Sequence, residues 1–347
     1  MRKTTALAAA AATLLVGSTA IAQTDLRVAG NFSGNEKHVD GVERPFFGSL
    51  SEESGIDLNV SYSPMDVLGV KADNALRLLK TGAFDIMSVQ VGMASRDDAF
   101  FEGIDLAGVA PDMDTLRDVV DAYREPFDKR LQERFNAKVL TLWPFGPQTI
   151  YCNADISGPS DFEGKKVRVF TPSMATLIDE LGGTSVTLQF SEVYPALQRN
   201  VADCAITAPT AGNSAKWPEV TSHFVPLAVT GSVQGHFINL DKWESFSQEE
   251  QEALMAEFQR MEDAMWDLAT KTNQDAIDCN VGRDSCSNHT KYDMELVEVT
   301  DQMESRVKQI AAETIVPNWL DKCTGVKSDC KSVWQNTAGN AANIELD

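Results

Sequence analysis

Common catalytic motifs are absent from this sequence of 347 residues. It contains no GxSxG nucleophile turn, no HExxH zinc motif, no GxGxxG dinucleotide loop and no Walker phosphate loop. Histidine is also scarce, and three of the four histidines, His223, His236 and His289, are interpreted as structural or surface residues. Acid pairs such as Asp97-Asp98 and Glu249-Glu250 lie in polar stretches, and no spacing singles one out as a catalytic pair. The sequence therefore offers no catalytic site and no cofactor site.

Positively charged residues are also few relative to acidic ones. The chain has 30 Lys and Arg residues against 51 Asp and Glu, a net charge of −21, and residues 1–22 contribute two of the positive charges and no acid. Without those residues the balance is 28 against 51, or −23. Such an excess of negative charge argues against nucleic acid and anionic membrane surfaces as partners. An anionic ligand would need a local, buried cation to overcome this background.

Long apolar runs are confined to the amino terminus. Residues 6–16 are Ala, Leu and Val apart from Thr13, and they follow a short basic start and precede the small-residue pattern Ala20-x-Ala22. These features predict a signal peptide over residues 1–22, cleavage after Ala22 and a periplasmic mature protein. The run is about half the length that spans a bilayer. An uncleaved membrane anchor is the alternative reading.

The six cysteines all follow residue 22, and none belongs to a CxxC pair. An even count in an oxidising compartment indicates disulfides. Six residues separate Cys279 from Cys286, and six separate Cys323 from Cys330, so both pairs can close short polar loops. Cys152 and Cys204 remain, and they form either a third bond or two buried thiols. Zinc binding competes with this reading near His289, but the sequence favours no metal site.

Short β-type runs alternate with helical patterns along the chain, which is typical of an α/β fold with largely parallel sheets. The expected strands are residues 26–29, 56–62, 85–89, 138–142, 149–152, 166–170, 185–188 and 204–207. The expected helices are residues 39–54, 66–79, 115–135, 173–181, 191–200, opening with Ser191 as its N-cap, and a long helix that follows Ser247 and runs into the 270s. The length of the chain allows two such α/β domains, each with its own core.

Five stretches resemble the periplasmic binding proteins of TRAP (tripartite ATP-independent periplasmic) transporters. Residues 161–169, DFEGKKVRV, resemble the family's D-L-K-G-x-K-x-R-V, and residues 191–203, SEVYPALQRNVAD, match its S-E-V-Y-x-A-L-Q-x-G-x-V-D almost in full. Weaker matches are residues 79–86, 216–220 and 239–251. The resemblance covers roughly residues 26–275. Asn200 and Cys204 replace glycines of the family pattern.

This resemblance implies a two-domain periplasmic binding protein with mixed, largely parallel sheets, hinge strands and a long domain-spanning helix. The expected domains are residues 25–147 with 233–273 and residues 148–232 with 274–347. It also implies a monomer that is not an enzyme, that captures a small carboxylate between its domains, and that delivers it to the small and large membrane subunits of the transporter. A secreted enzyme or a ligand sensor on the same architecture is the alternative, because fold alone does not decide function.

Arg168 matches the arginine that holds the ligand carboxylate in that family. Its place in an apolar strand supports this role, because a guanidinium that cannot lose its proton there requires an anionic partner. A carboxylate held by two parallel hydrogen bonds would satisfy it. A fixed salt bridge to an acid of the protein is the alternative.

The other expected ligand contacts are neutral. The family often has a second arginine at Gln148 and an asparagine at Thr207, so this chain lacks a second cation and a single carboxylate is the expected ligand charge. Asn31 and Gln90 follow parallel strands, whose ends face the cleft, although ordinary loop hydrogen bonding explains them equally well. The aromatic residues near these positions, Trp143, Phe145, Tyr151 and Phe170, belong either to the core or to the cleft. If Tyr151 and others line the cleft, an aromatic or otherwise apolar monocarboxylate suits it.

Overall fold

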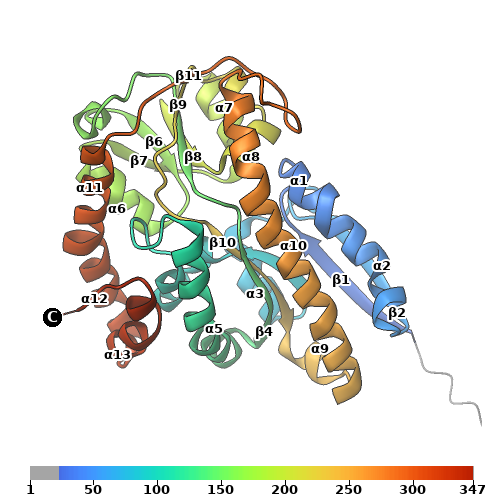
Figure 1. Ribbon diagram of the computed structural model, residues 1–347. Helices are drawn as coiled ribbons and strands as arrows, with labels where there is room; N and C mark the ends of the chain where they lie inside the picture. The colour runs from blue at the N-terminus through green and yellow to red at the C-terminus, as the bar shows by residue number, and fades with distance from the viewer. Residues whose placement is uncertain (1–22, 347) are drawn as a thin grey trace, which may run out of the picture.

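A computed structural model describes residues 23–346, which fold around two β-sheets (Figure 1). The signal peptide expected over residues 1–22 lies outside the described residues. The strands of the first sheet are β1 (Thr24–Gly30), β2 (Leu58–Pro64), β3 (Ile86–Gln90), β4 (Ala137–Pro144) and β10 (Val233–Asn239). Those of the second are β5 (Thr149–Cys152), β6 (Lys166–Val169), β7 (Thr184–Thr187), β8 (Cys204–Thr207), β9 (His223–Val225) and β11 (Glu295–Leu296).

Both sheets are mixed. The first has the order β2-β1-β3-β10-β4, in which β1 runs parallel to β2 and β3, whereas β10 is antiparallel to both of its neighbours. The second has the order β11-β9-β5-β8-β6-β7, with β6 parallel to β7 and β8 and with β5 antiparallel to β8 and β9. This arrangement confirms the predicted α/β fold with largely parallel strands.

Helices cover both sheets (Figure 1). Around the first sheet lie α1 (Glu36–His38), α2 (Arg44–Ser54), α3 (Ala75–Lys80), α4 (Val91–Ala94), the 3-10 helix η3 (Ala99–Ile104), α5 (Met113–Phe135) and α9 (Leu240–Glu244). Around the second lie α6 (Pro172–Glu180), α7 (Phe190–Gln198), α8 (Pro209–Ser214), the 3-10 helix η5 (Trp217–Glu219) and α11 (Asp301–Ile310). The chain ends with α12 (Val316–Val326) and α13 (Cys330–Trp334). No helix among the described residues is both long and apolar enough to cross a bilayer.

Two extended crossings and one helix join the units. The chain passes from β4 of the first sheet to β5 of the second, and it returns from β9 to β10. Helix α10 (Gln248–Asn280) contacts α2 and β4 in the first unit and α8 in the second, and Figure 1 shows it running along both. It begins as predicted: the Ser247 hydroxyl accepts a hydrogen bond from the Glu250 amide, and the Glu250 carboxylate accepts one from the Ser247 amide.

Two predicted helix starts are wrong. Residues 66–69 are turns and Ala72–Asn74 form a short 3-10 helix, so the α-helix expected from Asp66 begins only at Ala75. Gly69 has a φ of +70°, and the Asp66 carboxylate accepts hydrogen bonds from Ser33, both of which stop the helix from starting earlier. Helix α7 is capped at Gln189 instead of Ser191, because the side chain of Glu192 accepts a hydrogen bond from the Gln189 amide.

The domain boundaries stay a prediction. Helix α11 packs against α6 of the second unit, whereas α12 contacts η3 and the final turns contact α5, both in the first unit. Residues 316–339 therefore join the two units in addition to the crossings and α10.

All six cysteines form disulfides: the two pairs favoured by their spacing, and Cys152 with Cys204, for which the sequence left a bond and two free thiols both open. Cys152 and Cys204 face each other across the antiparallel strands β5 and β8, and the two other bonds are Cys279–Cys286 and Cys323–Cys330. The register of β5 and β8 explains the bond between Cys152 and Cys204. Residues that lie directly opposite each other in antiparallel strands have Cβ atoms about 4.5–5.5 Å apart.

Candidate ligand-binding site

A cavity lies between the two units and is lined by residues of both. Its first wall comes from the first unit and includes Asn31, Asn35, Gln90 and Gln234. The opposite wall comes from the second unit and includes Arg168, Phe170, Phe190 and Thr207. Phe145 and Gln148, on the crossing from β4 to β5, complete it. A ligand in this cavity would therefore contact both units at once.

Strand direction explains the first wall. Asn31 follows the carboxyl end of β1 and Gln90 ends β3, so the two parallel strands deliver them to the same edge of the sheet. Strand β10 runs the opposite way, so its amino end reaches that edge, and Gln234 pairs directly with Gln90. Sequence reasoning missed Gln234 because it considered only the residues that follow parallel strands.

Arg168 lies on β6 and is 2% exposed. Its Nε and Nη2 atoms donate to the carbonyl of Leu188 at 3.1 Å each, and Nη1 donates to the carbonyl of Ile206 at 2.9 Å. A guanidinium has five N–H groups, so one remains on each of Nη1 and Nη2. The ring of Phe170 lies 4.9 Å from the guanidinium carbon. Arg168 is thus held rigidly and still has two N–H groups for a further partner.

No carboxylate in the described part of the chain forms an ion pair with Arg168. Burial lowers the pKa of its guanidinium to about 9, which leaves it protonated at neutral pH. Arg168 is also the only charged side chain among the described residues that line the cavity. His38 lies behind Phe145, and burial lowers the pKa of this imidazole to about 4, so it adds no positive charge at neutral pH. The charge of Glu192 opposes the shift of Arg168 without forming an ion pair, so the cavity presents one cation that has no ion-pair partner among the described residues.

Asn31 is positioned by a buried carboxylate. One carboxylate oxygen of Glu43 accepts hydrogen bonds from the backbone N–H of Asn31 at 2.8 Å and from the Tyr62 hydroxyl at 2.7 Å. The other oxygen lies 2.9 Å from His236 Nε2. Burial opposes ionisation of Glu43, but the interactions with His236 and the hydrogen bonds from Asn31 and Tyr62 together outweigh it, so the pKa of Glu43 is lowered. Gly30 is required beside this network, since a Cβ there would lie 2.3 Å from the Tyr62 ring.

The structure brings five of the six predicted ligand residues to the cavity: Asn31, Gln90, Gln148, Arg168 and Thr207. The Gln90 side chain caps α4 by accepting from the Met93 amide at 2.6 Å, so part of its predicted role is ordinary loop bonding. The Gln148 amide nitrogen donates to the Gly146 carbonyl at 2.8 Å.

Tyr151, the sixth predicted residue, does not line the cavity. Its ring packs against Trp217 and Phe224, and its hydroxyl bonds to the Pro209 carbonyl at 3.0 Å and to Asn280 at 2.7 Å. It belongs to a small core beside α7. Its side chain shares a sheet face with Arg168, because both residues pair with Ala205, but its ring is taken up by the contacts with Trp217 and Phe224.

The aromatic lining differs in part from the expectation. Phe145 and Phe170 line the cavity, whereas Trp143 is buried beside His38 and His236. Phe32 and Phe190, which sequence reasoning missed, approach each other from opposite units with ring centroids 6.3 Å apart. Phe32 directly follows Asn31, so the end of the first strand carried a signal for it.

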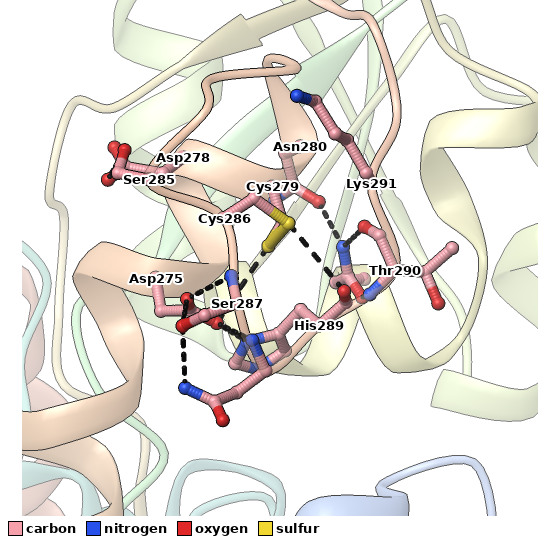
Figure 2. The surroundings of a disulfide bond; sticks show 12 residues. Asp275, Asp278, Cys279, Asn280, Ser285, Cys286, Ser287, His289, Thr290 and Lys291 are labelled. Atoms are coloured by element: carbon pink, nitrogen blue, oxygen red, sulfur yellow. Dashed lines mark hydrogen bonds and ion pairs between the residues drawn. A yellow bond between two sulfur atoms is a disulfide. The ribbon is translucent and has the colours of Figure 1, made fainter.

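Among the described residues, side chains of types that bind metal ions gather at the loop closed by the Cys279–Cys286 disulfide (Figure 2). Asp275 accepts hydrogen bonds there from Ser287, Asn288 and His289, at 2.6–3.0 Å. Cys279 lies within reach of Asp275 and His289, but its sulfur is bonded to Cys286 and is not a thiolate. This cluster therefore organises a loop, and its sulfur is not a metal ligand while the disulfide is intact.

Comparisons with known proteins agree with this architecture. The profile of the family described as "Bacterial extracellular solute-binding protein, family 7" matches residues 31–314. The chain is 28% identical over 222 residues to the sialic acid-binding periplasmic protein SiaP of Vibrio cholerae, covering 62% of this chain and 68% of that protein.

Solved structures show the same fold. An extracytoplasmic solute receptor of Bordetella pertussis that binds pyroglutamic acid superimposes with a TM-score of 0.79 at 20% identity, covering 92% of this chain and 99% of the other. A TRAP periplasmic solute-binding protein of Shewanella oneidensis, with bound succinate, gives 0.75 at 17% identity, covering 92% and 100%. The chain therefore belongs to family 7 of the bacterial extracellular solute-binding proteins, the periplasmic receptors of TRAP transporters.

Proposed function

We propose that this chain, as an exported monomer without catalytic activity, captures a small monocarboxylate in the cavity between its two units and delivers it to the membrane subunits of a TRAP transporter. One observation carries the choice of ligand charge: Arg168 is buried, has no carboxylate partner among the described residues and keeps two N–H groups free. A ligand carboxylate would supply the missing anion through two parallel charge-assisted bonds.

The remaining lining supports a single negative charge. Gln148 and Thr207 are neutral, and no second cation lines the cavity within the described residues. Four phenylalanines supply apolar surface, namely Phe32, Phe145, Phe170 and Phe190, which favours a ligand with a flat or apolar body. Relatives that bind pyroglutamic acid or succinate are consistent with a small carboxylate.

Ligand released from the purified protein and identified by mass spectrometry tests this proposal, together with calorimetry on a panel of mono- and dicarboxylates. We expect a small carboxylic acid that is recovered unchanged after incubation, and a protein that is stabilised against heat when the acid is added. Chemical conversion of the acid would instead support the alternative of an enzyme. Failure of every acid in the panel, with a released ligand that has no carboxyl group, would refute the proposal.

A further inference from the structure

Three polar atoms in the wall opposite Arg168 have no hydrogen-bond partner within residues 23–346. They are the Asn31 Nδ2, Asn35 Oδ1 and Gln234 Oε1 atoms, and all three residues line the cavity. The residues are deeply buried, with 1%, 3% and 2% of their surfaces exposed. Since buried polar groups in folded proteins are nearly always paired, these atoms indicate what the missing partner must offer.

The hydrogen bonds of the neighbouring atoms orient the two asparagines. The side-chain oxygen of Asn31, Oδ1, accepts a hydrogen bond from the Phe32 backbone N–H at 2.7 Å. Because a backbone N–H is always a donor, this bond fixes the orientation of the side chain and leaves Asn31 Nδ2 free. The same oxygen accepts from the Asn35 Nδ2 at 2.9 Å, which leaves the Asn35 oxygen free as an acceptor. In Gln234 the Nε2 donates to the Ser88 hydroxyl at 2.8 Å, so its oxygen is free as well.

We infer that Asn31, Asn35 and Gln234 form a second subsite that determines specificity. It selects a monocarboxylate that has a polar group at the end away from its carboxylate, where the ligand faces the first unit. This polar group is a hydroxyl or an amide, which offers both an N–H and a carbonyl. Such a group donates to the Asn35 or Gln234 oxygen and accepts from Asn31. This inference rests on the proposed function, because it assumes that Arg168 holds the carboxylate.

The same atoms reject two other classes of ligand. An apolar end would leave two buried acceptors and one donor unpaired, and sites built to hydrogen-bond a polar group discriminate strongly against analogues that lack it. A second carboxylate has only acceptor oxygens, which the Asn35 and Gln234 oxygens would repel, and no second cation lines the described cavity. A dicarboxylate such as succinate is therefore excluded by charge and by hydrogen-bond polarity together.

Calorimetry with matched pairs of acids tests this subsite. The pairs are pyroglutamate with cyclopentanecarboxylate, and 4-hydroxybenzoate with benzoate, and succinate is measured beside them. In each pair that binds, we expect the polar member to bind at least about tenfold more tightly than its apolar counterpart. Gln234→Met and Asn35→Leu should bring this ratio close to one by weakening the polar member alone, whereas Gln189→Met, which alters a glutamine outside the cavity, should leave it unchanged.

The outcomes separate this inference from the proposed function. If an apolar acid or succinate binds as tightly as the polar acids, or if the ratio survives in Gln234→Met, the subsite is refuted although the chain still binds carboxylates. If no acid binds and the released ligand has no carboxyl group, the proposed function fails first. Should Asn35→Leu not fold, as judged by circular dichroism, Gln234→Met alone decides.

Discussion

Replacing Arg168 with lysine tests whether its guanidinium binds the carboxylate of the ligand. Lysine keeps the positive charge, but its single ammonium cannot donate to the Leu188 and Ile206 carbonyls and also hold a carboxylate with two parallel bonds. Arg168 makes three hydrogen bonds to the protein and has two N–H groups left for the ligand. The substitution therefore removes at least one charge-assisted bond to the ligand.

The magnitude follows from that count. Hydrogen bonds to charged groups contribute about 1.5–3 kcal/mol each, and truncating one partner of a buried charged pair costs about 2–5 kcal/mol. We expect Arg168→Lys to weaken binding by roughly 2–4 kcal/mol, or about 30- to 1,000-fold, and Arg168→Ala by at least as much, since each 1.4 kcal/mol is tenfold.

Calorimetry with the acid released from the wild-type protein measures this loss. Arg199→Lys is the matched control, because Arg199 is exposed and lies outside the cavity, and its affinity should equal that of the wild type. Thermal unfolding without ligand shows whether either variant is damaged as a protein. Unchanged affinity in a folded Arg168→Lys or Arg168→Ala variant would refute the reasoning.

Three further predictions concern stability. Replacing Cys279 and Cys286 with serine opens a short loop and should lower the free energy of unfolding by about 2.5 kcal/mol in urea titrations; no loss would contradict it. Ser247→Ala removes the cap of α10 and should cost about 1 kcal/mol by the same assay, whereas an exposed change such as Ser305→Ala should cost much less. Burial raises the pKa of Glu102 to about 7, so the folded state binds its proton more tightly than the unfolded chain and stability should fall by up to about 3 kcal/mol from pH 4.5 to 7. Glu102→Gln, which keeps the oxygen that accepts from the Ser173 amide, should flatten part of this decline in thermal scans, and an identical pH profile would contradict the assignment.

Local features were predictable because their causes are local. The Ser247 cap needs only Glu250 three residues later, and the bond between Cys279 and Cys286 needs only a short polar loop. The strand around Arg168 was readable from its apolar neighbours, and the family resemblance supplied the role of its guanidinium.

Tertiary structure decided which side chains line the cavity. Gln234 reaches the cavity because β10 is antiparallel and its first residues pair with the end of β3, a register that no local pattern reveals. Asn35 lies beside Asn31 through one turn of chain, yet only the closed cavity shows that its oxygen is left unpaired. Tyr151 was misplaced because it shares a sheet face with Arg168 but packs into a core with Trp217 and Phe224, residues that lie more than 60 positions further along the chain. The sequence by itself thus determined most of the helices and strands, the Ser247 cap and the charge of Arg168. The polarity of the opposite wall of the cavity depends instead on contacts between residues far apart in the chain.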